Sequence, residues 1–340
     1  MTRYIIQRIA LVFLTAFIIL SLTFILMKML PLDKPAGQIN QQLAYYRNQV
    51  VLGYMEEVPT SALADATVVD RNTRYHFAAV PVMVQYFNWL KNIVTQWNWG
   101  LSTRIQINVS AMEIIGQKLP VSLKLNVIAL FTSVPFGFLF GVIAALRKNR
   151  MTDHVISTGV MIFISIPSFV FITFLMLLFA YRLGWLPTQW PKSGVGNDIK
   201  IKGYIIPVAA LSFGTIASFT RYTRAELTEI MASEFLLLAR TKGLTKRQTV
   251  VRHALRNSMV PIMPMIIGQF IGILSGSMIL ENLYGIPGIG SLFIQAINAK
   301  DYNVVMVDMA VFTIIGLLAT LLVDLSYGLV DPRIRMGARK

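Results

Sequence analysis

Long apolar runs alternate with short polar segments along most of this chain. The first run, Ile9–Leu30, contains only small polar residues until Lys28 near its end. A transmembrane helix takes about 20 consecutive apolar residues, so this run is long enough to cross a bilayer. Five more apolar runs follow it: Val121–Leu146, Val155–Ala180, Tyr204–Phe219, Ile262–Leu280 and Val304–Leu329. The pattern predicts an all-α integral membrane protein with six transmembrane helices.

Prolines and glycines lie within several of the runs. Pro167 falls inside the third run, and Pro207 and Gly214 are expected to break the fourth. Such residues are tolerated in membrane helices when neighbouring groups satisfy the freed backbone. The first run is longer than the apolar core of a signal peptide, and no Ala-x-Ala-like cleavage site follows it. We therefore expect a retained helix with its N-terminus inside.

Residues 31–119 form a polar segment without a further spanning run. Within it, Gln85–Thr95 has apolar residues at roughly helical spacing. The favoured interpretation is a helix on the membrane surface, with the aromatic residues of the segment as interface anchors. A role in holding a partner or ligand is the alternative. The aromatic residues in question are Tyr45, Tyr46, Trp89, Trp97 and Trp99.

Composition supports the membrane assignment. Hydrophobic residues make up 55% of the 340-residue chain, charged residues only 14%, and the mean hydropathy is +0.61. Soluble domains carry about 25% charged residues. The formal net charge of +15 suggests nucleic acid, but basic residues beside apolar runs are typical of cytoplasmic loops, so we expect no nucleic-acid partner. The absence of cysteine excludes disulfides and cysteine-based metal sites.

The distribution of charge predicts the orientation. Six helices place both termini on one side of the membrane. If that side is cytoplasmic, its segments (1–8, 147–154, 221–258 and 329–340) hold 17 of the 31 Lys and Arg residues and 5 of the 16 acids. This bias favours cytoplasmic N- and C-termini.

No motif of a catalytic or nucleotide-binding site is present. The chain has no phosphate-binding G-x-x-x-x-G-K-[ST] loop and no H-E-x-x-H sequence. The GIPGIG sequence at 285–290 is interpreted as a tight turn. Asp308 and Asp324 lie within the last apolar run, and we expect Asp324 to pair with an arginine rather than to contact substrate. The chain is thus predicted not to be an enzyme and to bind no ATP or metal itself.

The segment Ser233–Pro261 departs from the pattern, because apolar residues occur in a strongly basic loop. A helix from Ser233 to Lys242 is predicted, with Ser233 or Thr228 as its cap and Gly243 as its end. A second helix is expected over Lys246–Ser258, ending before Pro261. The first helix would align Phe235, Leu238, Ala239 and Lys242 on one face. Such a face either lies on anionic lipid or docks into another protein, and docking is favoured.

Three sequences in this region carry a family resemblance. They are Arg221-x-x-Arg224, EFLLLARTKGL at 234–244 and RHALRNSMVP at 252–261. Together they resemble the EAA loop of ABC importer permeases of the oligopeptide, dipeptide and nickel group, B-type subunit. Leu236 stands where an arginine is usual, and Glu234 replaces an aspartate. The first apolar run and the C-terminal third, including ENLYGIPGIGSLFIQAINAKDY, resemble the same subunit.

The resemblance implies a type I ABC importer permease fold with a cytoplasmic coupling helix. It divides the chain into residues 1–30 with the first span, an extracytoplasmic segment 31–119, and a permease core 120–340 whose EAA-type loop is 221–261. The residues it implies for coupling to an ATPase are Glu234, Phe235, Leu238, Ala239, Arg240, Lys242 and Gly243.

The implied function is ATP-driven import of oligopeptides across the cytoplasmic membrane of a prokaryote. The implied partners are a homologous permease, two ATP-binding subunits that hold ATP and Mg²⁺, an extracytoplasmic peptide-binding protein and membrane lipid. Dipeptides, nickel or metal chelates are alternative substrates. A stand-alone channel or secondary carrier, and a membrane scaffold, are alternatives of other classes.

Overall fold

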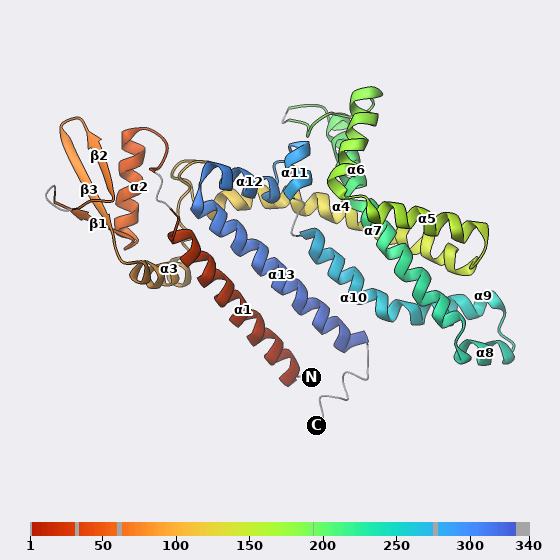
Figure 1. Ribbon diagram of the computed structural model, residues 1–340. Helices are drawn as coiled ribbons and strands as arrows, with labels where there is room; N and C mark the ends of the chain where they lie inside the picture. Colours follow the sequence, from red (N-terminus) through yellow and green to blue (C-terminus); the bar gives the residue numbers. More distant parts are fainter. Residues whose placement is uncertain (1, 31–33, 60–62, 193, 275–277, 331–340) are drawn as a thin grey trace. The chain divides into compact units, whose positions relative to one another are not determined.

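The structure is a computed structural model that describes residues 2–30, 34–59, 63–192, 194–274 and 278–330 (Figure 1). Its helices are α1 (Thr2–Lys28), α2 (Ile39–Val51), α3 (Val82–Gln96), α4 (Ala111–Leu146), α5 (Met151–Ser165), α6 (Ser168–Leu175), α7 (Asn197–Met231), α8 (Glu234–Thr241), α9 (Lys246–Thr249), α10 (Leu255–Leu274), α11 (Met278–Tyr284), α12 (Ile289–Ala299) and α13 (Tyr302–Val330). Two π-helical stretches, η1 (Met176–Arg182) and η2 (Val250–Ala254), follow α6 and α9. The strands are β1 (Met55–Val58), β2 (Ala66–Asp70) and β3 (Thr73–Ala79).

Four described helices are long and apolar enough to cross a membrane. These segments match the first, second, fourth and sixth predicted spans: Ile5–Lys28, Ala111–Leu146, Asn197–Met231 and Tyr302–Ser326. A bent pair formed by α5 and α6–η1 adds a fifth if it is one span. The predicted run Ile262–Leu280 includes residues 275–277, which lie outside the described residues. Six spans and cytoplasmic termini therefore stay predictions.

The third and fourth spans differ from the prediction in opposite ways. The third is broken by a bend of 102° between α5 and the α6–η1 helix. Ile166 is extended there (φ −88°, ψ 119°), because a residue that precedes proline is disfavoured in the helical region. The fourth is a continuous helix, α7, that passes through Pro207 and Gly214. The prediction of a break in α7 was wrong because packing against neighbouring helices supports a membrane helix around a proline.

The chain divides into two compact units, and the first consists of Met1–Ala10, Val121–Ile286 and Ile315–Lys340. Its central element is α7, against which α5, α6 and α10 pack (Figure 1). Tyr284 closes one apolar cluster of this unit and donates its hydroxyl to the Pro187 carbonyl at 2.9 Å. Burial raises the pKa of the Tyr284 hydroxyl to about 12, so this donor keeps its proton at physiological pH.

The predicted pairing of Asp324 is confirmed, because its carboxylate lies 3.0 Å from Arg8.

Helices α4 and α7 approach each other closely at two glycines spaced as G-x-x-x-G. A Cβ atom on Gly137 would lie 2.5 Å from the Phe219 Cβ, and one on Gly141 would lie 2.9 Å from the Thr220 carbonyl oxygen. The Thr220 hydroxyl also donates to the Gly137 carbonyl at 3.2 Å. Small residues permit such approach in membranes, where van der Waals packing and hydrogen bonds hold helices together.

We expect Gly141→Leu to weaken the α4–α7 packing. Overpacking costs about 1–3 kcal/mol, and the Thr220 backbone cannot move away without shifting α7. The measurement is the thermal melting midpoint of the purified protein in detergent. Gly159→Leu on α5 is the matched control, since open space surrounds that glycine. Equal midpoints for the two variants would contradict the close approach.

The second unit consists of Leu11–Pro120 and Pro287–Ile314. It contains an antiparallel sheet with strand order β1-β3-β2, so the all-α prediction was wrong for this segment. The reason is a short period-two pattern: Ala66 and Val68 of β2 are buried while Thr67 and Val69 are exposed. Val68 packs with Phe77 of β3 and with Tyr46 of α2.

The predicted helix at Gln85–Thr95 is confirmed as α3, but its aromatic residues are core residues. Trp89 packs on Phe24 of α1 with ring centroids 4.8 Å apart, and Trp99 packs edge-on against Trp89. Both tryptophans are buried in one cluster, so the interpretation of these two as membrane-interface anchors was wrong. Trp97, in contrast, is exposed.

One buried carboxylate joins distant parts of the second unit. Asp301, between α12 and α13, accepts a hydrogen bond from the Ser102 hydroxyl at 2.5 Å. The same oxygen accepts from the backbone amides of Thr103, Arg104 and Ile105 at 2.9–3.1 Å. The α12–α13 junction is thereby fixed to the loop before α4.

The predicted turn at 285–290 is also present, with Gly285 at φ +70°.

Candidate functional site

The basic segment folds as a helix, a glycine turn and a second helix, as predicted. Helix α8 begins after Ser233, whose backbone is extended; its hydroxyl donates to the Ile230 carbonyl rather than capping α8. Thr228, the other predicted cap, lies inside α7. Glu234 in the first turn complements the helix dipole.

Gly243 ends α8 in a left-handed conformation, with φ +87°. Its amide donates to the Arg240 carbonyl at 3.0 Å, and the Leu244 amide donates to the Ala239 carbonyl at 3.4 Å. This pair of bonds is the Schellman motif, in which glycine is favoured because it has no Cβ. The predicted turn at Gly243 is confirmed.

Helix α8 divides its apolar residues between two faces. Leu236 is fully buried in a cluster with Ala145 of α4, Leu227 of α7 and Ala254 of η2. Ala239 is buried as well, so it faces the protein. Phe235 and Leu238 are 49% and 57% exposed, and Leu237 is exposed beside them. Glu234, Arg240, Lys242 and Gly243 are exposed too.

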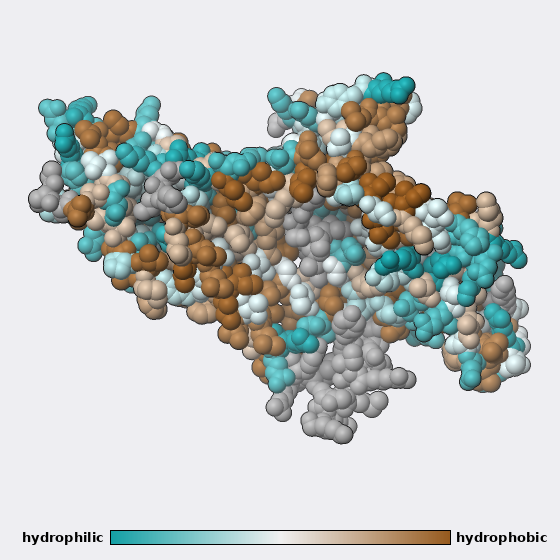
Figure 2. Space-filling view, in the orientation of Figure 1, coloured by the Kyte–Doolittle hydropathy of each residue, from teal (hydrophilic) through white to brown (hydrophobic). Residues whose placement is uncertain are grey.

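The outward residues Phe235, Leu237 and Leu238 form what we call the α8 surface. Figure 2 shows hydrophobic atoms at α8 next to hydrophilic ones. Three large apolar side chains exposed on a helix of eight residues indicate an interaction surface.

The second helix is longer than predicted. It starts at α9, passes through η2 and continues as α10 to Leu274, with Pro261 and Pro264 inside. The predicted end before Pro261 was wrong, because a proline within a membrane helix is tolerated where neighbouring helices support it, and α10 packs on α7. Phe235 of α8 meets His253 of η2 edge to face, with ring centroids 5.7 Å apart. Helix α8 is therefore held to the helix that leads into α10.

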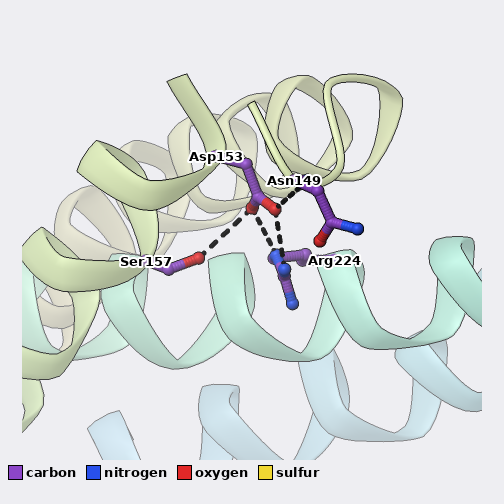
Figure 3. A network of polar contacts seen from close by, with 4 residues as sticks. All are labelled: Asn149, Asp153, Ser157 and Arg224. Atoms are coloured by element: carbon purple, nitrogen blue, oxygen red, sulfur yellow. Dashed lines mark hydrogen bonds and ion pairs between the residues drawn. The ribbon is translucent and has the colours of Figure 1, made fainter. Parts of the chain in front are cut away.

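A buried ion pair joins α5 to α7, N-terminal to the basic segment (Figure 3). Asp153, at the start of α5, is 1% exposed and accepts two hydrogen bonds from Arg224 of α7, at 2.5 and 2.8 Å. The Asn149 backbone amide and the Ser157 hydroxyl also donate to this carboxylate. Four donors satisfy the buried charge, so α5 is fixed to α7 two turns before α7 ends.

Comparison with known proteins places this architecture in a family. Residues 137–336 match the family model described as binding-protein-dependent transport system inner membrane component. The dipeptide transport system permease DppB of Lactococcus lactis subsp. cremoris is 34% identical, over 99% of this chain and 100% of the relative. The chain belongs to this family of inner membrane transport components.

Other relatives and one solved structure agree with that assignment. The oligopeptide transport system permease OppB of Escherichia coli K12 is 32% identical over 98% of this chain and all of its own. The dipeptide permease DppB of Bacillus subtilis 168 is 32% identical over 99% of both chains. A chain of the MetNI methionine ABC transporter, in inward facing conformations, has a TM-score of 0.51 at 17% identity and covers 65% of this chain and 97% of its own. This last likeness concerns the fold alone.

In this inner membrane component, two residues of the site were not anticipated from sequence. Leu236 stood out only because it replaces a usual arginine, and the structure uses it to anchor α8. Asp153 was one acid in a basic loop, and only its pairing with Arg224 gives it a role. An acid followed by serine four residues later on an apolar helix was the available signal.

We expect Gly243→Val to lower substrate uptake per ATP hydrolysed more than Gly243→Asn does. A left-handed conformation costs a non-glycine residue about 1–3 kcal/mol, and asparagine tolerates it better than a β-branched residue. Since open space surrounds Gly243, the effect acts through the backbone turn that directs α8. The measurement is substrate uptake per ATP hydrolysed by the assembled transporter, which should fall for valine and hold for asparagine. Equal ratios for both variants would show that the turn does not transmit motion.

Proposed function

We propose that this chain is the B-type permease subunit of an ATP-driven importer of oligopeptides. The observation that carries the proposal is the similarity over 98–99% of the chain to relatives named as oligopeptide and dipeptide permeases. Dipeptides, nickel and metal chelates are the substrates to be tested beside oligopeptides.

The α8 surface supports the coupling part of the proposal. Phe235 and Leu238 would enter a groove on an ATPase subunit, with Glu234, Arg240 and Lys242 at its rim. Ala239 would support the helix from the inside, and Gly243 would set its direction. Because Leu236 is buried against α4, α7 and η2, a force on α8 reaches the membrane helices through side-chain contacts.

The assembly we propose has a second, homologous permease, two ATPase subunits and an extracytoplasmic peptide-binding protein. ATP and Mg²⁺ bind to the ATPase subunits. The chain contributes six spans with both termini in the cytoplasm, a first segment 1–30, an outer segment 31–119 and a core 120–340 in the cytoplasmic membrane of a prokaryote.

Reconstitution tests the function directly. The chain is co-expressed with the homologous permease and the ATPase subunits, placed in proteoliposomes and supplied with the binding protein. We expect accumulation of labelled tri- to pentapeptides that requires ATP, and no ATP hydrolysis by the chain alone. Solute flux through the chain without the ATPases would instead identify a channel or carrier. ATP-driven uptake of nickel but not of peptides would identify nickel, in place of peptides, as the substrate.

A further inference from the structure

A cavity of about 430 Å³ lies at the break of the third span, within the first compact unit. Residues from α4, the α5–α6 bend, α7 and α10 line it. Transporters place substrate sites at interrupted membrane helices, because irregular backbone at membrane depth is stable only where protein or a cavity surrounds it. The 102° bend at Ile166 and Pro167 is such an interruption.

The wall of this cavity contains a polar group that lacks a partner. Asn126 of α4 is 1% exposed, and within the described chain neither its amide nitrogen nor its amide oxygen has a hydrogen-bond partner. A buried amide without hydrogen-bond partners is costly, so this position favours a ligand that supplies them. The Asn126 side chain offers N–H donors and a carbonyl acceptor on one planar group, which match the C=O and N–H of a single residue in an extended peptide, because those two groups lie on the same edge of the backbone.

The rest of the lining suits a chain of varied side chains. Phe213 of α7 packs against Phe163 of α5 and Phe171 of α6, with ring centroids 4.9 and 4.7 Å apart. These rings form an apolar wall that discriminates weakly between side chains. Gln269 of α10 adds a second amide to the lining. Gly214 leaves open space at its Cβ position, so the cavity is unobstructed there.

We propose that this cavity binds the backbone of a peptide in transit, with Asn126 pairing with the N–H and C=O of one peptide residue and the three phenylalanines accommodating side chains. This inference rests on the proposed function, because it takes the substrate to be a peptide. The proposed site recognises the peptide backbone rather than the side chains. A peptide importer needs such recognition in order to accept many sequences.

The first test fills or labels the cavity in the complete transporter with its binding protein. Gly214→Leu adds a side chain where there is space, so folding should be retained and peptide uptake should fall at least about tenfold while ATP hydrolysis and assembly persist. Gly159→Leu on α5, also in open space and outside the lining, should leave uptake unchanged. Since the chain has no cysteine, Gly214→Cys gives a single thiol in this subunit, and trialanine should slow its reaction with a maleimide during turnover.

The second test asks what Asn126 recognises. Asn126→Leu keeps the volume and removes both hydrogen-bonding atoms, so half-saturating concentrations should rise about tenfold for peptides of different side chains alike. A change limited to one peptide sequence would overturn backbone reading.

Three results would overturn the cavity as a peptide site. They are normal uptake by Gly214→Leu, loss of the second permease from that variant, which would assign the cavity to the subunit interface, and no protection of the thiol by trialanine. The wild-type transporter keeps these results separate from the proposed function, because failure of that function would abolish peptide uptake by the wild type itself.

Discussion

Replacing Leu238 with glutamate is expected to lower ATP-driven uptake by about 30- to 1,000-fold, the effect of losing about 2–4 kcal/mol at the centre of an interface. The side chain is 57% exposed in the isolated chain, so the substitution leaves the fold of the subunit intact. Within an apolar groove of a partner, the new carboxylate would be buried without a counter-charge. The measurement is the amount of ATPase subunit that co-purifies with the permease, together with uptake in proteoliposomes.

Leu238→Met is the control for this experiment. Methionine keeps the apolar volume, and such swaps usually cost less than about 1.5 kcal/mol. We expect near-normal co-purification and uptake from this variant. Normal uptake by the glutamate variant would mean that the α8 surface lies outside the interface with the ATPase.

Asp153→Ala is expected to be strongly destabilising, because it breaks a buried ion pair of the first compact unit. It leaves Arg224 without its partner, and removal of one member of a buried pair costs about 3–5 kcal/mol. The guanidinium is partly exposed, so we expect the lower end of this range. The measurement is the thermal midpoint in detergent, with protease sensitivity of residues 147–154 as a second readout.

The double variant Asp153→Leu with Arg224→Met distinguishes a role of the ion pair in stability from a role in transmitting motion between helices. Replacing both partners by apolar residues is often neutral, so the thermal midpoint should largely recover. If the ion pair also transmits motion between α7 and α5, uptake per ATP hydrolysed should stay low in this stable variant. Full recovery of both quantities would restrict the pair to a structural role.

The apolar pattern predicted much of the fold because membrane helices are specified locally, by length and hydropathy. It predicted α1, α4, α7 and α13, and turn chemistry predicted Gly243 and Gly285. What it missed depends on tertiary contacts. A proline lies next to the bend at Ile166, and another, Pro207, lies inside the continuous helix α7. The sequence signal is the same in both places, and only the packing around each proline decides between a break and a helix.

The sheet within residues 31–119 and the buried face of α8 were missed for a related reason. In this sheet β1 and β2 pair on either side of β3, and short strands of mixed polarity give a weak signal. Hydrophobic periodicity placed Phe235, Leu238 and Ala239 on one face, but burial separates Ala239 from the other two. The number of apolar residues on an eight-residue helix does not reveal which of them already has a partner within the chain.

The coupling role of this chain depends most on whether the α8 surface contacts an ATPase or the membrane. A photoreactive benzoylphenylalanine in place of Leu238, in the assembled transporter in proteoliposomes, tests this directly. The same residue in place of Leu236, which is fully buried, is the control. We expect a covalent adduct between position 238 and an ATPase subunit, and none from position 236. Adducts of position 238 with lipid alone would contradict docking of the α8 surface into an ATPase.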